Sequence, residues 1–134
     1  MATQPGPINL HYGWPASADL SAKQFYFVEV TTGEITVCNA AGDYAVGVLA
    51  NKPTAQGQMG DVVMFGPTKV IAGGAITAGA LVTTDGNGKA VSVSPTGGAG
   101  DVNKAILGRA MTDSGGDGEI IGVWVNCINP GPAH

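Results

Sequence analysis

The sequence predicts an all-β protein made of short antiparallel strands. Runs rich in Val, Ile and Thr recur along the chain, and turns rich in Gly, Asp and Asn separate them. No segment shows the apolar periodicity of an amphipathic helix. The order of the runs also repeats once, which indicates two copies of one β-unit. We therefore expect a small antiparallel β-barrel or β-sandwich, built from two quasi-repeated β-units that bury each other's apolar faces and preceded by an extended N-terminal arm.

Length and composition fit one folded domain. The chain has 134 residues, of which 44% are hydrophobic, 22 are glycine and 8 are proline. That much glycine and proline occurs in disordered chains, but the hydrophobic share is large enough to form a core. Charged residues make up only 12% of the chain, about half the usual share. A weakly charged exterior favours a surface that partner proteins cover.

Residues 1–18 differ from the rest and are predicted to form the arm. Prolines and glycines prevent regular structure there, and the segment has no obvious partner strand. Two arrangements are open: the arm folds back across its own domain, or it lies on another chain by strand addition or by docking its aromatic side chains in a groove. Its apolar residues alternate along one edge and are Ile8, Leu10, Tyr12 and Trp14.

The β-domain is expected over residues 19–129, and its first half, about 19–72, opens with a hairpin. The runs 25–30 (FYFVEV) and 34–38 (EITVC) flank the turn residues Thr32-Gly33. Gly66-Pro67 is expected to stop a strand, because proline cannot donate to a strand ladder. The further strands expected in this half are 44–50, 61–65 and 68–72.

The second half, about 73–129, follows the same order, and a short tail, 130–134, ends the chain. The stretch 70–91 (VIAGGAITAGALVTTDGNGKAV) is the seam between the halves, where AGGAITAG carries the chain across and LVTTDGNGKAV opens the second copy with a hairpin. The matched segments are GEITV at 33–37 with GKAVSV at 88–93, VGVLA at 46–50 with ILGRA at 106–110, and GDVVMF at 60–65 with GEIIGVWV at 118–125.

The titratable residues form no recognisable catalytic or metal site. Only His11 and His134 could act as near-neutral bases, and both lie in terminal segments instead of fixed positions. Cys38 and Cys127 lack CxxC spacing, and the sequence leaves open whether they pair. We therefore expect no enzyme, no metal and no cofactor.

The acidic and glycine-rich stretches are expected to be turns. Residues 85–88 (DGNG) and 113–119 (DSGGDGE) offer carboxylates, but they do not match the ligand order of an EF-hand loop. The seam contains neither GxxxxGK[ST] nor GxGxxG, so it is not a phosphate loop. Asp and Asn in such turns cap backbone groups.

Charge and hydropathy argue against two classes of partner. The formal net charge is −4, and the five lysines and one arginine are scattered along the sequence, so no basic stripe is expected to neutralise nucleic-acid phosphates. No apolar run reaches the length of a membrane span, and the first residues lack the pattern of a signal peptide. We expect synthesis in a cytoplasm without export, and neither a nucleic-acid nor a membrane partner.

Residues 19–125 resemble the capsid decoration, or head cement, proteins of tailed bacteriophages. The resemblance lies in the order of motifs: LSA before an aromatic and valine-rich strand, then YAVGVLANKPTAQGQMGDVVMFGPTKVIAGGAITAGALVTTDGNGKAV, then AILGRAMTDSGGDGEIIGVWV. It includes no catalytic motif and does not extend to the arm.

The resemblance implies a structural protein of the virion, made in the host cytoplasm. It implies a homotrimer on the outer surface of an icosahedral capsid that clamps neighbouring major capsid protein subunits and stabilises the expanded lattice. Its partners would be the major capsid protein and itself. We expect the arm to contact the shell through its apolar anchors, although Trp14 has the alternative of packing on its own domain. The four expected anchors are Ile8, Leu10, Tyr12 and Trp14.

A ligand- or carbohydrate-binding β-module on a larger viral or cell-surface assembly is the competing hypothesis. An exposed Trp124 or Tyr44 would then stack on a sugar. Trp124 lies within an apolar run (IIGVWV), where burial in a core or an interface is the usual outcome. The cement function is therefore preferred.

Overall fold

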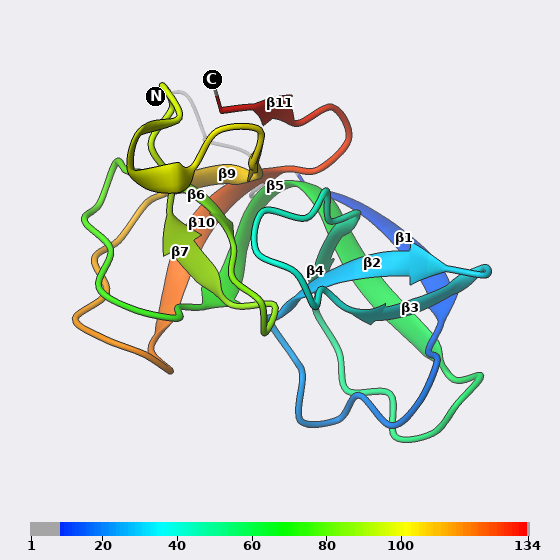
Figure 1. Ribbon diagram of the computed structural model, residues 1–134. Helices are drawn as coiled ribbons and strands as arrows, with labels where there is room; N and C mark the ends of the chain where they lie inside the picture. The colour runs from blue at the N-terminus through cyan, green and yellow to red at the C-terminus, as the bar shows by residue number, and fades with distance from the viewer. Residues whose placement is uncertain (1–8, 134) are drawn as a thin grey trace, which may run out of the picture.

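A computed structural model, which describes residues 9–133, shows one strongly curled antiparallel sheet (Figure 1). The sheet has nine strands in the order β3-β2-β4-β5-β10-β9-β6-β7, with β1 pairing with β5 off this path, and β8 and β11 form a separate two-stranded sheet. The predicted all-β antiparallel class is confirmed. The sheet has two lobes, one built on β1 to β4 and the other on β6, β7, β9 and β10 (Figure 1).

The strands are short, with one exception. Among the described residues the one helix is the 3₁₀ turn η1 (Gly98–Gly100), and no helix there is long and apolar enough to cross a membrane. The strands are β1 (Leu10–Pro15), β2 (Phe27–Thr31), β3 (Glu34–Val37), β4 (Gly47–Leu49), β5 (Met59–Ile71), β6 (Leu81–Thr84), β7 (Ala90–Ser92), β8 (Ala105–Ile106), β9 (Gly108–Ala110), β10 (Ile120–Asn126) and β11 (Gly131–Pro132).

Strand β5 spans 13 residues and belongs to both lobes. Its first part pairs with β1 and β4, and its second part pairs with β10. The prediction that Gly66-Pro67 stops a strand is wrong. Gly66 has a φ of +108°, which glycine adopts readily, and the pairing of β5 with β10 continues through Gly66 and Pro67. Pro67 lies beyond the last residues that pair with β1 and β4, so it occupies an edge position where a missing N–H is tolerated.

Both predicted hairpins are present. In the first, β2 pairs with β3 across Thr32 and Gly33, whose φ angles of +54° and +79° are those of a type I′ turn. In the second, β6 pairs with β7. The carboxylate of Asp85 accepts hydrogen bonds from the backbone N–H groups of Asn87 and Lys89, both at 2.9 Å. This acidic turn therefore caps its own backbone, as expected.

Of the two arrangements open for the arm, its described part lies on its own domain. Strand β1 runs antiparallel to β5, and the fully buried Ala16 then bridges to Ile35 of β3. At the other end of the chain, β11 pairs with β8 and Ala133 is fully buried. Both terminal segments, as far as they are described, therefore contribute to the folded body.

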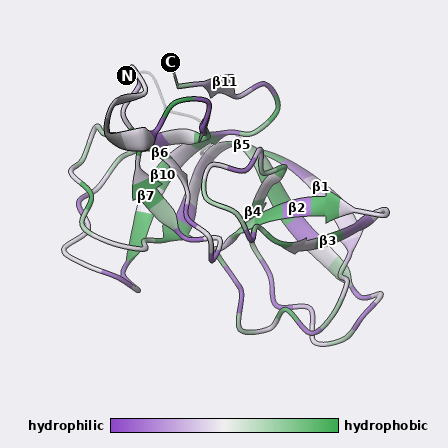
Figure 2. Ribbon diagram, in the orientation of Figure 1, coloured by the Kyte–Doolittle hydropathy of each residue, from purple (hydrophilic) through white to green (hydrophobic). Residues whose placement is uncertain are grey.

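The curled sheet encloses two hydrophobic clusters, and the strands carry the strongest hydrophobic colouring in Figure 2, for example on β2, β5 and β7. The smaller cluster includes Leu20, Val28 and Leu49, and the larger one includes Phe27 and Leu107. Two isolated β-bridges bring the outermost strands back towards β5. Ile35 of β3 bridges to Ala16, which follows β1, and Ala90 of β7 bridges to Ala72, which follows β5. The larger cluster joins the two lobes, because it contains Phe27 and Val48 of β2 and β4 together with Val82 and Val123 of β6 and β10.

Replacing Gly108 by Ala is expected to destabilise the fold. A Cβ at this position would overlap the carbonyl oxygen of Trp124 and crowd the Cα of Val125, which are backbone atoms that cannot rotate away. We expect Gly108→Ala to lower the free energy of unfolding by about 1–3 kcal/mol, the usual cost of overpacking. Urea denaturation measures this change. Gly74→Ala is the matched control, because no heavy atom lies within 4 Å of its Cβ position, and equal stability of the two variants would contradict the packing.

Candidate functional site

The first candidate surface is the described part of the arm. Leu10 and Tyr12 are 51% and 58% exposed, although they belong to a strand of the sheet. Trp14 is half-buried and packs against the smaller hydrophobic cluster, and its ring lies 4.6 Å from that of Tyr12. Ile8 lies outside the described residues. The structure thus places Leu10 and Tyr12 where a partner can reach them, while Trp14 fixes β1 to its own domain.

Leu10 is one end of a row of apolar residues that crosses three strands. Phe65 of β5 lies opposite Leu10 in the β1–β5 ladder. The ring of Phe65 meets that of Trp124 on β10 edge to face, with 5.8 Å between centroids. We call Leu10, Phe65 and Trp124 the apolar strip. It gives the sheet a continuous apolar surface that sequence reasoning did not identify.

Trp124 is 41% exposed, while its neighbours Val123 and Val125 are fully buried. Of the two outcomes expected for this apolar run, burial of Trp124 in the core is therefore wrong, and its burial in an interface stays a prediction. The residues of β10 alternate between the two faces of the sheet, as strand geometry requires. A strict reading of 120–126 as an antiparallel strand with one solvated face would have found this residue.

Trp124 also lines an open groove of about 280 Å³. Two polar side chains line it: one N–H of Arg109 donates to the carbonyl of Gly79 at 2.7 Å, and Oδ1 of Asn126 accepts from the backbone N–H of Asn129 at 3.3 Å. The other lining residues are apolar or glycine, so the groove offers mainly apolar contact. Its lining consists of Leu81, Ile106, Gly108, Arg109, Trp124, Asn126, Pro130 and Gly131.

The described histidine is bonded to a carboxylate. The Nδ1 atom of His11 lies 2.8 Å from Oδ1 of Asp61, and both side chains are more than 40% exposed. A carboxylate that orients an imidazole is part of many catalytic sites, but such sites also need a nucleophile and a sheltered cavity. The pair of His11 and Asp61 lies on an open surface, so it lacks the sheltered position of such a site.

One cluster of potential metal ligands occurs within residues 9–133. One ligand atom from each of Glu29, Cys38 and Asp43 lies within 4.8 Å of the others. Burial and the neighbouring charge of Asp43 raise the pKa of Glu29. Burial, followed by the charges of Glu29 and Asp43, raises the pKa of the Cys38 thiol. Without a cation between them, the three groups thus disfavour one another's charged forms.

The two cysteines are free thiols inside the larger hydrophobic cluster. Burial raises the pKa of Cys127 to about 12. Both thiols therefore stay protonated near neutral pH, when reactive cysteines would be thiolates. They act as small apolar residues of the core.

The sequence and the fold of this chain were compared with those of known proteins. The family model described as "Phage cement protein" matches residues 3–125, so the match extends into the arm, which the resemblance from sequence motifs did not cover. The crystal structure of the N base of head fiber gp8.5 from bacteriophage phi29 is similar in fold, with a TM-score of 0.65 and 20% identity over 90% of this chain and 96% of that chain. No curated protein matches the sequence.

The buried thiol of Cys127 predicts a loss of stability at alkaline pH. Because its pKa is raised in the folded state, its contribution is complete below the unfolded pKa near 9 and declines as pH rises towards about 12. In this window the wild-type free energy of unfolding should fall by up to about 1.4 kcal/mol per pH unit from this thiol. Urea unfolding at several pH values should show a shallower decline for Cys127→Ala, and equal slopes would contradict a buried neutral thiol.

Proposed function

This chain belongs to the phage cement protein family, whose model matches residues 3–125, and from this premise we propose that it binds the outside of an icosahedral phage capsid and stabilises the lattice of the major capsid protein. The family match over nearly the whole chain is the observation that carries the proposal. Phage cement proteins are structural proteins of the virion and not enzymes. The chain accordingly acts through the surfaces that it covers and the subunits that it holds together.

Stabilisation would follow from mass action. A protein that binds the assembled lattice but not the free subunits favours the lattice by an amount that grows with its concentration and affinity. At a free concentration about 100 times the dissociation constant, each site contributes about 2.7 kcal/mol. Binding sites that span two capsid subunits would convert this energy directly into resistance to subunit separation.

We propose that the β1 side of the molecule contacts the shell. Leu10 and Tyr12 are exposed there, and the apolar strip continues this surface through Phe65 to Trp124. Ile8 remains a proposed anchor on the strength of its alternation with Leu10 in the sequence. Trp14 would contribute by holding β1 in place, because it packs on its own core. Exposed aromatic and aliphatic anchors of this kind dominate the energy of many interfaces.

We also propose that the protein is a homotrimer on the virion. Support comes from the resemblance to head cement proteins and from exposed apolar residues outside the β1 surface, including Val102, Met111 and Ile128. A trimer that engages several capsid subunits would bind with avidity, so weak individual contacts would suffice.

The carbohydrate-binding alternative is less well supported. Tyr44 and Trp124 are exposed, as that hypothesis requires. However, recognition of a sugar needs several polar groups that can bond to hydroxyls, and of the side chains that line the groove beside Trp124 only Arg109 and Asn126 are polar. An apolar protein surface fits this groove better than a sugar.

The origin of the domain from two copies of one β-unit is a further proposal. The strand order β3-β2-β4-β5 in one lobe corresponds to β7-β6-β9-β10 in the other, and these strands contain the segments matched in sequence. This correspondence supports a duplication. An experimentally determined structure in which residues 27–65 and 81–125 superpose poorly would contradict it.

Replacing Leu10 and Tyr12 by Ser is expected to weaken binding to the shell. Both side chains are exposed, so the melting temperature should fall only by the loss of the ring contact between Tyr12 and Trp14, while the affinity for expanded capsids falls by at least about tenfold. Co-sedimentation with capsids that lack the protein measures this affinity. Tyr44→Ser is the matched control, because Tyr44 is exposed to a similar degree, 52%.

The outcomes of this experiment separate two claims. Absence of binding by the wild-type chain would overturn the proposed function. Equal binding by the wild type and the Leu10→Ser/Tyr12→Ser variant would remove the β1 surface from it.

The proposed trimer predicts a particle of three times the chain mass of 13.3 kDa, about 40 kDa. Static light scattering on the purified protein measures this mass without a shape assumption. A monomer at all concentrations up to the millimolar range would show that any trimer forms only on the capsid, and a stable dimer would contradict the proposal.

A further inference from the structure

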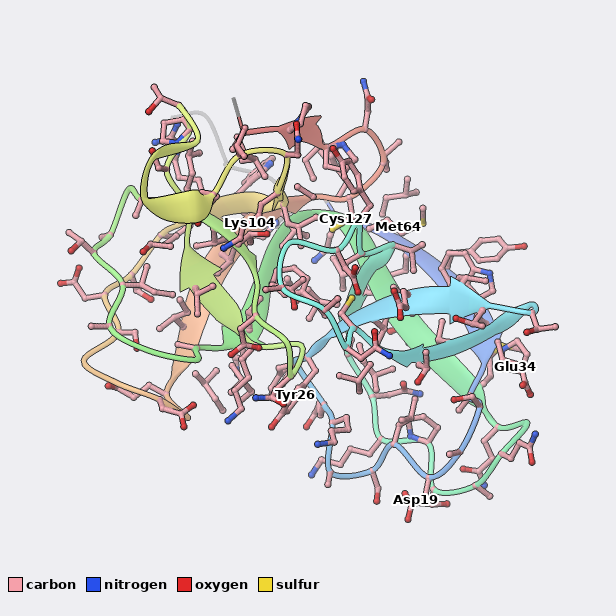
Figure 3. All side chains as sticks on the ribbon, in the orientation of Figure 1. Asp19, Tyr26, Glu34, Met64, Lys104 and Cys127 are labelled. Atoms are coloured by element: carbon pink, nitrogen blue, oxygen red, sulfur yellow. The ribbon has the colours of Figure 1, made fainter. Side chains whose placement is uncertain are left out.

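A shallow basin of about 340 Å³ lies where the two lobes meet. Its lining comes from the loop before β2, from the end of β5 and from the start of β10, and it shares no residue with the apolar strip or the groove beside Trp124. Figure 3 shows Tyr26, one of its lining residues, on the lower side of the molecule between the lobes. Phe25, Tyr26, Ile71 and Ile120 supply its apolar part, and Ser21 and Gln24 supply polar groups.

Four of the five lysines of the chain converge on this basin. Lys52 and Lys89 line it directly. The Nζ atom of Lys23 lies 4.9 Å from the ring centroid of Tyr26, and that of Lys69 lies 6.0 Å from the ring centroid of Phe25. The expectation that the cations are scattered therefore holds along the sequence but not in space. We call this site the lysine basin.

Three of these lysines have no acidic partner. Lys89 donates to Asp117 at 3.0 Å, so its charge is balanced. Within residues 9–133, Lys23, Lys52 and Lys69 form no salt bridge. A chain with a net charge of −4 thus gathers three unbalanced positive charges around one aromatic floor.

The backbone of the basin is also unusual. Phe25 has a φ of +71°, a conformation that a bulky residue rarely adopts. Two backbone bonds hold it there: its N–H donates to Leu49 at 2.6 Å, and its carbonyl accepts from the N–H of Ile71 at 2.9 Å. Strained residues fixed in this way occur preferentially at functional sites.

We propose that the lysine basin binds an acidic segment of a partner protein. Carboxylates of the segment would meet Lys23, Lys52 and Lys69, and an apolar side chain beside them would pack on Phe25 and Tyr26. Charge complementarity of this kind guides association and fixes orientation. For the identity of the partner, the major capsid protein, this inference rests on the proposed function.

The chemistry favours an acidic peptide over a nucleic acid. Asp117 lies at the basin beside Lys89, and Asp19 is bonded to Ser21, which lines it. These carboxylates would repel a continuous phosphate backbone, whereas a peptide can place its few charges opposite the lysines. Three unbalanced cations are also too few for the phosphate contacts on which nucleic-acid affinity depends.

The test compares capsid binding by Lys52→Gln/Lys69→Gln with that of Lys104→Gln. Lys104 carries the same charge but pairs with Asp101 and lies apart from Tyr26 (Figure 3). Near 0.05 M salt the double variant should bind expanded capsids about five- to tenfold more weakly than the wild type, and the difference should shrink towards about 0.5 M salt because ions screen exposed charges. The control should bind like the wild type.

A second arm makes the inference independent of the capsid. Amide chemical shifts of the wild type are followed by NMR during titration with a short peptide of Glu and Gly that contains one Phe, with the same peptide carrying Gln for Glu, and with an oligothymidylate. Shifts around residues 21–26, 52 and 69 with the acidic peptide alone support the inference. Tighter binding of the oligothymidylate, or no saturable binding of any probe, overturns it.

The two arms also separate this inference from the proposed function. If the wild type binds capsids and the double variant binds equally well, the lysine basin is excluded and the cement function stands. If the wild type does not bind capsids, the cement function fails together with the identity of the partner, and the peptide titration alone decides whether the basin recognises acidic segments.

Discussion

The continuous ladder of β5 is the constraint on which the rest of the structure depends. This strand serves two lobes, because it pairs with β1 and β4 along its first part and with β10 along its second. Neither hydrophobic cluster would be enclosed without it, since each outer strand curls back towards residues next to β5. The same strand carries residues of both proposed surfaces, because Phe65 belongs to the apolar strip while Lys69 and Ile71 belong to the lysine basin.

Local features of the fold could be predicted from the sequence, and long-range ones could not. Thr32-Gly33 and the turn at Asp85 are determined by backbone preferences of a few residues, so both hairpins were predicted correctly. The length of β5 was missed, because whether proline ends a strand depends on whether a neighbouring strand needs its N–H, which is a tertiary property. The exposure of Trp124 and the convergence of Lys23, Lys52 and Lys69 depend on which strands pair, and spacing along one sequence carries no such information.

The features of the molecule agree with a structural role on a virion. Its thiols are buried and protonated, its histidine and carboxylate pair lies on an open surface, and its low charge leaves apolar strands that a partner can cover. Membership of the phage cement protein family accounts for this combination. In the proposed arrangement the apolar strip supplies burial energy, while the lysine basin supplies direction and salt dependence. These two terms would make attachment both strong and specific for one arrangement of capsid subunits.

The central claim, that binding of this protein strengthens the capsid lattice, is tested most directly by calorimetry of expanded capsids that lack it. The disassembly temperature is measured while the protein is added in increasing amounts. We expect this temperature to rise with added protein and to level off once the sites on the shell are filled. Bound protein that leaves the disassembly temperature unchanged would show that the protein decorates the shell without cementing it, and would contradict the proposed function.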